Sequence, residues 1–121
     1  PLLLDRSPEA LWKMVADHEV TAAFSFNDMM AGWVQKELRN RGLAVPRDLS
    51  LISVDNMPYS GFFDAPLTTY ALPGAEIGRH ATDLLLRRLR GEQFPPQDIR
   101  LPAQLIMRES IRPIDEAESG R

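Results

Sequence analysis

Residues 49–54, LSLISV, form a nearly continuous apolar run of strand length that lies between Asp48 and Asp55. Runs of this kind are typical of a strand that is buried on both faces of a parallel sheet. The patterns around the run alternate between helix and strand, in the order α-β-α-β-loop-β-α-β. This order predicts an α/β domain with a mostly parallel sheet flanked by helices.

Apolar spacing and helix-ending residues place the other elements. Helices are expected at 8–17, 28–41 and 75–90, the first of them capped by Ser7, and the last two stopped by Gly42 and Gly91. Strands are expected at 21–26, 49–54 and 67–71, with one or two short strands within 99–107. The polar residues 114–121 are expected to form a disordered tail.

The composition excludes several classes of function. Without cysteine the chain has no disulfide framework, thiolate metal site or cysteine nucleophile, and two histidines leave little for a zinc site. The 14 Lys and Arg against 17 Asp and Glu give a net charge of −3, which argues against DNA binding by this chain itself. We therefore expect neither a metal nor a cofactor.

The first residues, PLLLD, include no initiator Met, which indicates a chain cut from a longer one or processed. They also lack the basic region and the cleavage site of a signal peptide. The longest apolar runs are far shorter than the roughly 20 residues that cross a bilayer. We expect a cytoplasmic location.

Two predicted strands end in polar pairs, Asn27-Asp28 and Asp55-Asn56. In sheets of this class ligands bind outside the carboxyl ends of the strands. Asp28 is expected to cap the following helix and to place its charge near the positive end of the helix dipole. Asn27 is better placed to point into a cleft, where its amide both donates and accepts hydrogen bonds.

For Asp55 the spacing leaves two interpretations open. Its carboxylate either accepts hydrogen bonds from loop N–H groups or faces a cleft and accepts them from sugar hydroxyls or base N–H groups. A third use pairs it with Asp28 for acid–base catalysis. The chain offers no placed histidine, no glycine-rich phosphate loop and no set of metal ligands, so we do not expect an enzyme.

The expected loop 56–66 is unusual because it carries aromatic residues among its prolines and glycine. These are Tyr59, Phe62 and Phe63, accompanied by Met57 and, on the preceding helix, by Trp33. Such side chains either pack locally or form an interface with another protein.

Five blocks match a known family in order and spacing: TAAFSFNDMMA at 21–31, RGLAVPRDLS at 41–50, SVDN at 53–56, PLTT at 66–69 and RES at 108–110. Between about Ser7 and Pro113 the chain resembles the C-terminal part of the lactose-repressor/galactose-repressor family of bacterial transcription regulators. The resemblance implies the C-terminal lobe of a two-lobed effector-binding domain of the periplasmic-binding-protein type, spanning 1–113. Residues 72–91 resemble a helix of the other lobe, and that lobe and the DNA-binding head are missing.

The resemblance also implies roles for particular residues. Asp55 matches the family's ligand-binding aspartate and Asn27 a position whose amide often touches the effector, a sugar or related small molecule. Residues 57–63 and the start of the helix 28–41 resemble a dimer-forming surface, so the expected interface residues are Met57, Tyr59, Phe62, Phe63 and Trp33. Operator DNA would be bound only through the missing helix-turn-helix. The alternative is a sugar-binding protein of a transport system, which shares the fold.

Three positions depart from the family's usual pattern. Gly32 stands where a large aliphatic residue is common and Trp33 where glycine is common, so packing along this helix is expected to differ. Leu72 replaces a glutamine that commonly follows the PLTT strand, which removes one polar group near the cleft and argues against a typical small sugar.

Overall fold

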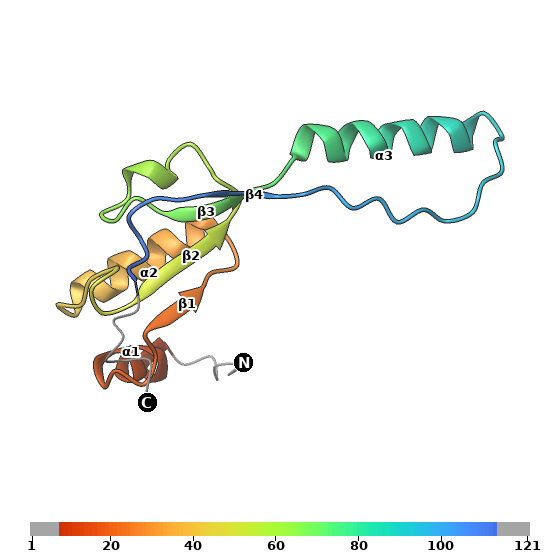
Figure 1. The fold of residues 1–121 in the computed structure, drawn as a ribbon. Helices are drawn as coiled ribbons and strands as arrows, with labels where there is room; N and C mark the ends of the chain where they lie inside the picture. Colours follow the sequence, from red (N-terminus) through yellow and green to blue (C-terminus); the bar gives the residue numbers. More distant parts are fainter. Residues whose placement is uncertain (1–7, 114–121) are drawn as a thin grey trace.

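The computed structural model describes residues 8–113, in which a twisted sheet carries helices on one face and a long arm projects from one of its edges (Figure 1). The helices in this part are α1 (Pro8–Ala16), α2 (Asp28–Asn40), the short 3-10 helix η1 (Ser60–Phe62) and α3 (Gly74–Leu89). The strands are β1 (Ala22–Phe24), β2 (Ser50–Val54), β3 (Thr68–Ala71) and β4 (Gln104–Ile106). The expected cap Ser7 and the expected tail 114–121 lie outside the described residues.

The helices end where the sequence predicts. Gly42 follows α2 with a φ of 74° and Gly91 follows α3 with a φ of 85°. Because glycine adopts positive φ without a steric cost, each of these residues turns the chain out of the helix.

The strands are ordered β1-β2-β3-β4 across the sheet. The first three run parallel, and β4 pairs antiparallel with β3. This arrangement confirms the predicted α/β class with a mostly parallel sheet. Because parallel strands share one direction, the polar residues that follow β1 and β2 meet at a single edge of the sheet.

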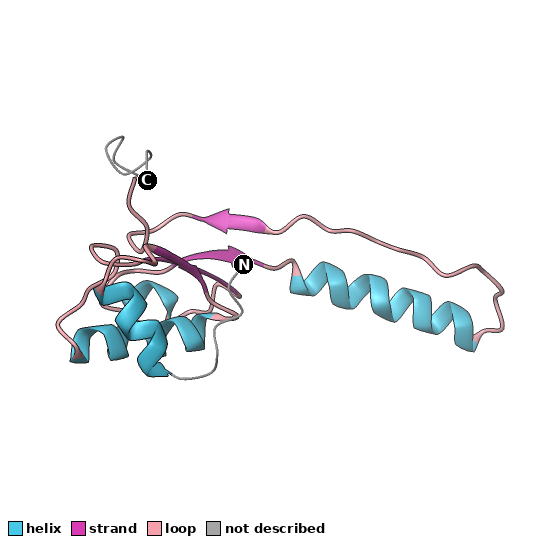
Figure 2. Cartoon of the chain, turned by 90° about the horizontal axis from the view of Figure 1, so that it is seen from below, coloured by secondary structure: helices cyan, strands magenta, loops and turns pink. Residues whose placement is uncertain are grey.

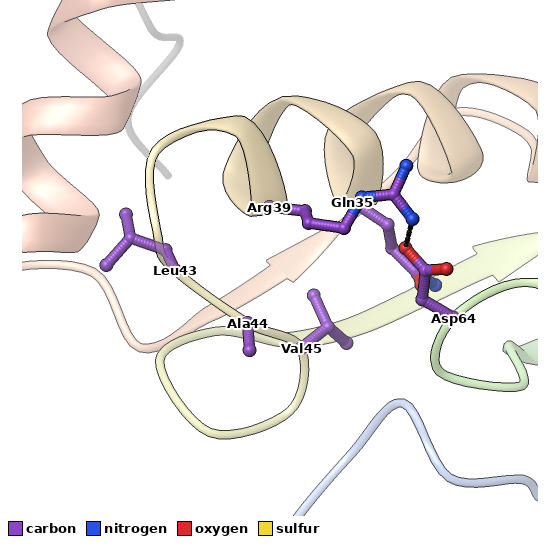
Figure 3. A pocket seen from close by; sticks show the side chains of 6 residues that line it. All are labelled: Gln35, Arg39, Leu43, Ala44, Val45 and Asp64. Carbon is purple, nitrogen blue, oxygen red and sulfur yellow. Dashed lines mark hydrogen bonds and ion pairs between the residues drawn. The ribbon is translucent and has the colours of Figure 1, made fainter.

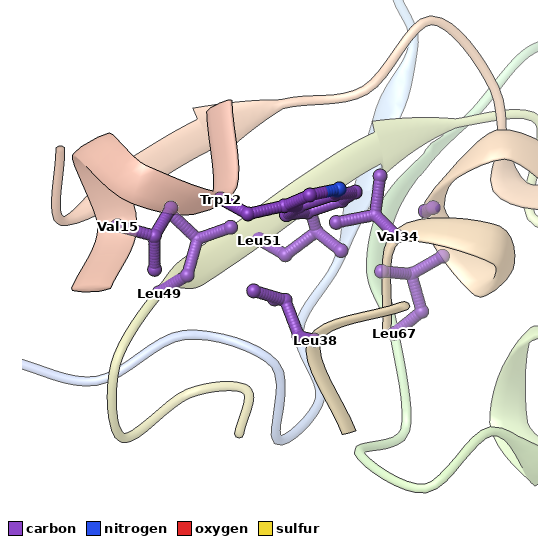
Figure 4. Close-up of a cluster of buried hydrophobic side chains, with 8 residues drawn as sticks. Trp12, Val15, Val34, Leu38, Leu49, Leu51 and Leu67 are labelled. Carbon is purple, nitrogen blue, oxygen red and sulfur yellow. The ribbon is translucent and has the colours of Figure 1, made fainter. Parts of the chain in front are cut away.

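The core lies between this sheet and the pair of helices α1 and α2 (Figure 4). It is built from Trp12, Val15, Ala31, Val34, Leu38, Leu49, Leu51 and Leu67. The expectation that β2 is buried on both faces is wrong, since only Leu51 and Ser53 are buried and their neighbours in the strand are half-buried. The physical reason is that α1 and α2 contribute to the same core on one face, and no described helix covers the other face.

The arm consists of α3 and the segment that returns from it to β4 (Figures 1 and 2). No residue of α3 is buried, although Ile77, Leu85, Leu86 and Leu89 are apolar. Arg87 and Arg88 lie over the Phe94 ring, with guanidinium-to-centroid distances of 4.5 and 4.2 Å. These contacts hold the return segment to the tip of the helix. Ile99 and Leu101 of that segment also line a hollow together with Ile77 and Leu84 of α3, but none of these side chains is buried. Among the described residues, no helix has the length and apolarity needed to cross a membrane.

A buried carboxylate joins the first turn of α2 to the sheet. Asp28 is fully buried and accepts hydrogen bonds from the hydroxyls of Ser53 on β2, Ser60 on η1 and Thr69 on β3. It also accepts one from the Met57 backbone N–H at 2.8 Å. One side chain thus connects α2, two strands and the loop between them.

The environment of Asp28 changes its pKa. Burial alone raises the pKa, but the hydroxyls of Ser53, Ser60 and Thr69 and the N–H of Met57 outweigh burial and hold the pKa below its ordinary value of 3.8. Because the pKa is lower in the folded state, the ionised group stabilises the fold above its ordinary pKa. That contribution is lost as the pH falls through the folded pKa.

Replacing Asp28 by Asn should lower the free energy of unfolding by about 2 kcal/mol near pH 7, because a neutral amide cannot accept hydrogen bonds from all four donors. The difference from wild type should shrink as the pH falls below the ordinary pKa of 3.8, because the unfolded chain takes up the proton first and the folded carboxyl group does so only at its lower pKa. Urea unfolding near pH 7 and near pH 3 measures both effects.

The exposed Asp17, at the end of α1, supplies a matched control. Asp17→Asn should change the free energy of unfolding by no more than about 0.5 kcal/mol. Equal stability of Asp28→Asn and wild type near pH 7 would contradict the structural role of this carboxylate.

Candidate functional site

The candidate site is the edge of the sheet at which β1 and β2 end. The two strands pair parallel, with Phe24 beside Ile52, and the Ser25 N–H extends the pairing by donating to the Ile52 carbonyl at 2.7 Å. Asn27 follows β1 and Asp55 follows β2, so the fold brings the two expected ligand-binding residues to the same edge.

The Asp55 carboxylate has no hydrogen-bond or ion-pair partner among the described residues, and the residue is exposed. Its backbone N–H donates to the Tyr70 carbonyl at 2.9 Å, which anchors the residue to β3. Of the two interpretations left open by the sequence, the structure excludes the one in which loop N–H groups satisfy this carboxylate. Both of its oxygens are left available to a ligand.

Asn27 is the N-cap of α2. Its side-chain oxygen accepts a hydrogen bond from the Met30 N–H at 2.8 Å, and its backbone is extended, as a cap requires. The half-buried amide keeps its NH2 group without a partner among the described residues. Asn27 therefore caps the helix with its side-chain oxygen and retains both N–H donors of its amide for a ligand.

The assignment of the cap to Asp28 is wrong, because Asn27 fills that role and Asp28 points into the protein. The charge of Asp28 does lie in the first turn of α2, as expected. The acid–base pair of Asp28 and Asp55 is also excluded, since a fully buried carboxylate with four donors cannot reach a substrate. Within residues 8–113 no group of three or more acidic or histidine side chains could hold a metal ion.

Most of the expected interface residues lie at the surface. Phe62 is 88% exposed, and Met57, Tyr59 and Trp33 are exposed to a smaller extent. Phe63 differs, because its ring packs on Gly32, where an added Cβ would lie 2.6 Å from the ring. The unusual Gly32 thus makes room for Phe63, while Trp33 packs on Trp12 with ring centroids 5.8 Å apart.

A hollow lies elsewhere, between the end of α2 and the loop 43–45 (Figure 3). Its polar side chains are already paired: Gln35 bonds both the N–H and the carbonyl of Ala65, and Arg39 forms an ion pair with Asp64 at 2.5 Å. Because these groups are occupied, this hollow is a weaker candidate for a ligand site than the sheet edge.

Two features of the site were missed in the sequence. Phe24 and Phe26 are exposed beside Asn27, and nothing in the strand pattern shows which aromatic residues the sheet leaves uncovered. Arg108 donates to the Asn56 side-chain oxygen and to the Leu67 carbonyl, both at 2.7 Å. Its place in the RES block was a signal, but the partner lies 52 residues away in the chain.

Comparison with known proteins supports this description. The family model of the periplasmic binding protein-like domain matches residues 4–111. The transcriptional repressor CytR of Escherichia coli K12 is 41% identical over 92 residues, which are 76% of this chain and 27% of CytR. The chain spans 27% of the length of CytR and 32% of the length of the repressor PurR of Vibrio cholerae, so it corresponds to about a third of such proteins.

Two solved structures have the same fold. A LacI family regulator from Enterococcus faecium with bound ribose has a TM-score of 0.70 and 28% identity, over 92% of this chain and 42% of that one. The lac repressor dimer bound to operator and the anti-inducer ONPF has a TM-score of 0.71 and 27% sequence identity. The match covers 85% of this chain and 36% of the lac repressor chain. The chain therefore belongs to the family of periplasmic binding protein-like domains, and within it is similar to parts of LacI-family transcriptional regulators.

Proposed function

We propose that this chain is the C-terminal lobe of the effector-binding domain of a bacterial transcriptional repressor, and that its effector is a sugar or a related metabolite. The observation that carries the proposal is the exposed Asp55 carboxylate, which has no partner among the described residues and stands at the sheet edge. Ligands of such sheets bind at this edge, and a free carboxylate there accepts hydrogen bonds from neighbouring hydroxyls.

The solved relatives support a hydroxyl-rich ligand. One regulator holds ribose, and another, from Arthrobacter, holds lactose. In this chain the Asp55 carboxylate would accept hydrogen bonds from the ligand, and the free NH2 group of Asn27 would donate to it. Sugar hydroxyl groups suit both residues because each hydroxyl can donate and accept. Phe24 and Phe26, which precede Asn27 in the chain, are exposed and would add an apolar surface.

The arm supports a two-lobed domain. The amphipathic helix α3 has no buried residue, so its apolar stripe needs a further partner surface, and α3 reaches away from the sheet that could have covered it (Figure 1). We assign residues 72–91 to the second lobe and the rest of 1–113 to the C-terminal lobe. Operator DNA would be bound by a helix-turn-helix outside this chain. Closing the two lobes around the effector would shift the regulator between two conformations.

The regulator is favoured over the transport alternative because CytR and the lac repressor, two of the relatives described above, are repressors. The parent protein would act in the cytoplasm, where operators are, and would bind its ligand without chemical turnover. The net charge of −3 agrees with DNA contacts made by another part of the protein.

We further propose that Met57, Tyr59, Phe62 and Trp33 form a homodimer surface, with Phe63 supporting it from beneath. Exposed aromatic and methionine side chains are enriched in protein interfaces. The surface is rigidly attached to the site, because Asp28 bonds both Met57 and Ser60 in the same loop.

Asp55→Ala in the complete regulator should weaken effector binding by about 1 to 3 kcal/mol, the range for hydrogen bonds to a charged group. The wild-type regulator is first titrated by calorimetry with the sugars held by solved relatives, which are ribose, cellobiose, lactose, sucrose and glucose. The sugar that binds most tightly is then titrated into Asp55→Ala to measure the loss of affinity. Asp17→Asn, far from the edge, should leave the affinity unchanged. Undiminished binding by Asp55→Ala would remove Asp55 from the site.

Phe62→Asp should convert the dimer to monomer, because a charge would be buried without a partner in an apolar interface. Sedimentation velocity of the complete protein measures the change. Phe62→Leu retains an apolar side chain and should remain dimeric. A Phe62→Asp protein that sediments like wild type would place the interface elsewhere.

A further inference from the structure

The backbone turns sharply where β2 meets the candidate site. Asp55 has a φ of 120° and Asn56 a φ of 51°, two consecutive non-glycine residues in the positive-φ region. L-residues avoid this region, so such a conformation persists only where the surroundings hold it, and it often marks a functional position. The direction of the Asp55 carboxylate depends on this turn, which we call the Asp55–Asn56 corner.

Arg108 holds the corner from the side of β3. Its guanidinium donates to the side-chain oxygen of Asn56 at 2.7 Å and to the carbonyl of Leu67 at 2.7 Å. Its own backbone N–H donates to the Thr68 hydroxyl at 2.9 Å, which fixes the start of the side chain. The planar guanidinium suits this task because its donors have a fixed relative geometry that an ammonium group lacks.

Arg108 itself is fixed by the residues that follow it. Ser110 is fully buried, donates to the Leu51 carbonyl at 2.5 Å and accepts from the Thr68 N–H at 2.8 Å. The segment 108–110 is thus joined to both β2 and β3. Because the backbone of residues 108–110 is fixed in this way, the Arg108 guanidinium is held in place and can restrict the conformation of the Asp55–Asn56 corner.

The opposite side of the corner is held by the Asp28 network. The Asn56 N–H donates to the Thr69 hydroxyl at 3.3 Å, and the next N–H, of Met57, donates to Asp28. Of the two side chains of the corner, that of Asn56 accepts from Arg108, whereas that of Asp55 has no partner among the described residues. The corner therefore fixes the backbone and leaves the carboxylate free.

We propose that Arg108 is a positioning residue for effector binding: by holding the Asn56 side chain it keeps the Asp55–Asn56 corner, and with it the Asp55 carboxylate, in the orientation that receives a ligand hydroxyl. This inference rests on the proposed function of Asp55. Arg108 makes no ion pair with Asp55 or with any other described acidic residue, so its effect passes through Asn56.

Two substitutions of Asn56 separate the hydrogen bond from backbone strain. Asp and Gly both tolerate positive φ, but only Asp keeps an acceptor for Arg108. In the complete regulator, calorimetry with the sugar that binds wild type most tightly in the panel above should give Asn56→Asp nearly wild-type affinity. Asn56→Gly and Arg108→Lys should each lose about tenfold, the effect of about one lost hydrogen bond.

A second measurement distinguishes positioning from general stability. In Arg108→Lys the amides of Asn56 and Met57 should exchange with deuterium faster, while those of Leu38 and Leu51 in the core keep their rates. Arg100→Lys, an exposed arginine near β4, is the matched control and should change neither exchange nor affinity. Wild-type affinity in both Asn56→Gly and Arg108→Lys would overturn the inference.

The outcomes also separate this inference from the function on which it rests. Loss of binding in Asp55→Ala, with unchanged binding in Asn56→Gly and Arg108→Lys, rejects the positioning role alone. If Asn56→Asp loses sugar affinity while Arg108→Lys retains it, Asn56 is a direct ligand contact, and the positioning role of Arg108 is again rejected. A wild-type regulator that binds no sugar of the panel contradicts the sugar-effector proposal and the inference together.

Discussion

The buried carboxylate of Asp28 is the interaction on which the rest of the structure depends. It accepts hydrogen bonds from β2, β3, η1 and the loop between β2 and β3, while its own backbone forms the first turn of α2. An unpaired charge in this position would be costly, so the four donors must be present together. This requirement fixes the sheet edge, the α2 terminus and the aromatic loop relative to one another.

Two aspartates at one sheet edge thus have opposite roles because their surroundings differ. Asp28 has all its partners inside the protein, whereas Asp55 finds none among the described residues. The Asp28 network also holds Met57, which belongs to the proposed dimer surface, and the buried Ser60, which lies in the same loop. A ligand that moved the Asp55–Asn56 corner would therefore act on residues adjoining that surface, which offers a short physical route from effector to dimer geometry.

The sequence predicted the elements well because their signals are local. Apolar spacing located the helices, Gly42 and Gly91 marked two helix ends, and the order of elements indicated the α/β class. The wrong or missing predictions concern hydrogen-bond partners that are distant in the chain, or adjacent residues whose side chains point in different directions. Asn27 and Asp28 are both good capping residues, and only the fold shows that the second points inward. The same holds for Phe62 and Phe63, of which Gly32 accommodates the latter.

In the proposed two-lobed regulator, the sheet edge beside Asp55 forms half of the effector site. A crystal structure of the complete protein with its bound sugar would show this site directly. We expect the sugar between the lobes, with a hydroxyl donating to the Asp55 carboxylate, Asp28 still enclosed, and α3 covered by the second lobe. A sugar bound away from this edge, with Asp55 left in solvent, would contradict this proposal.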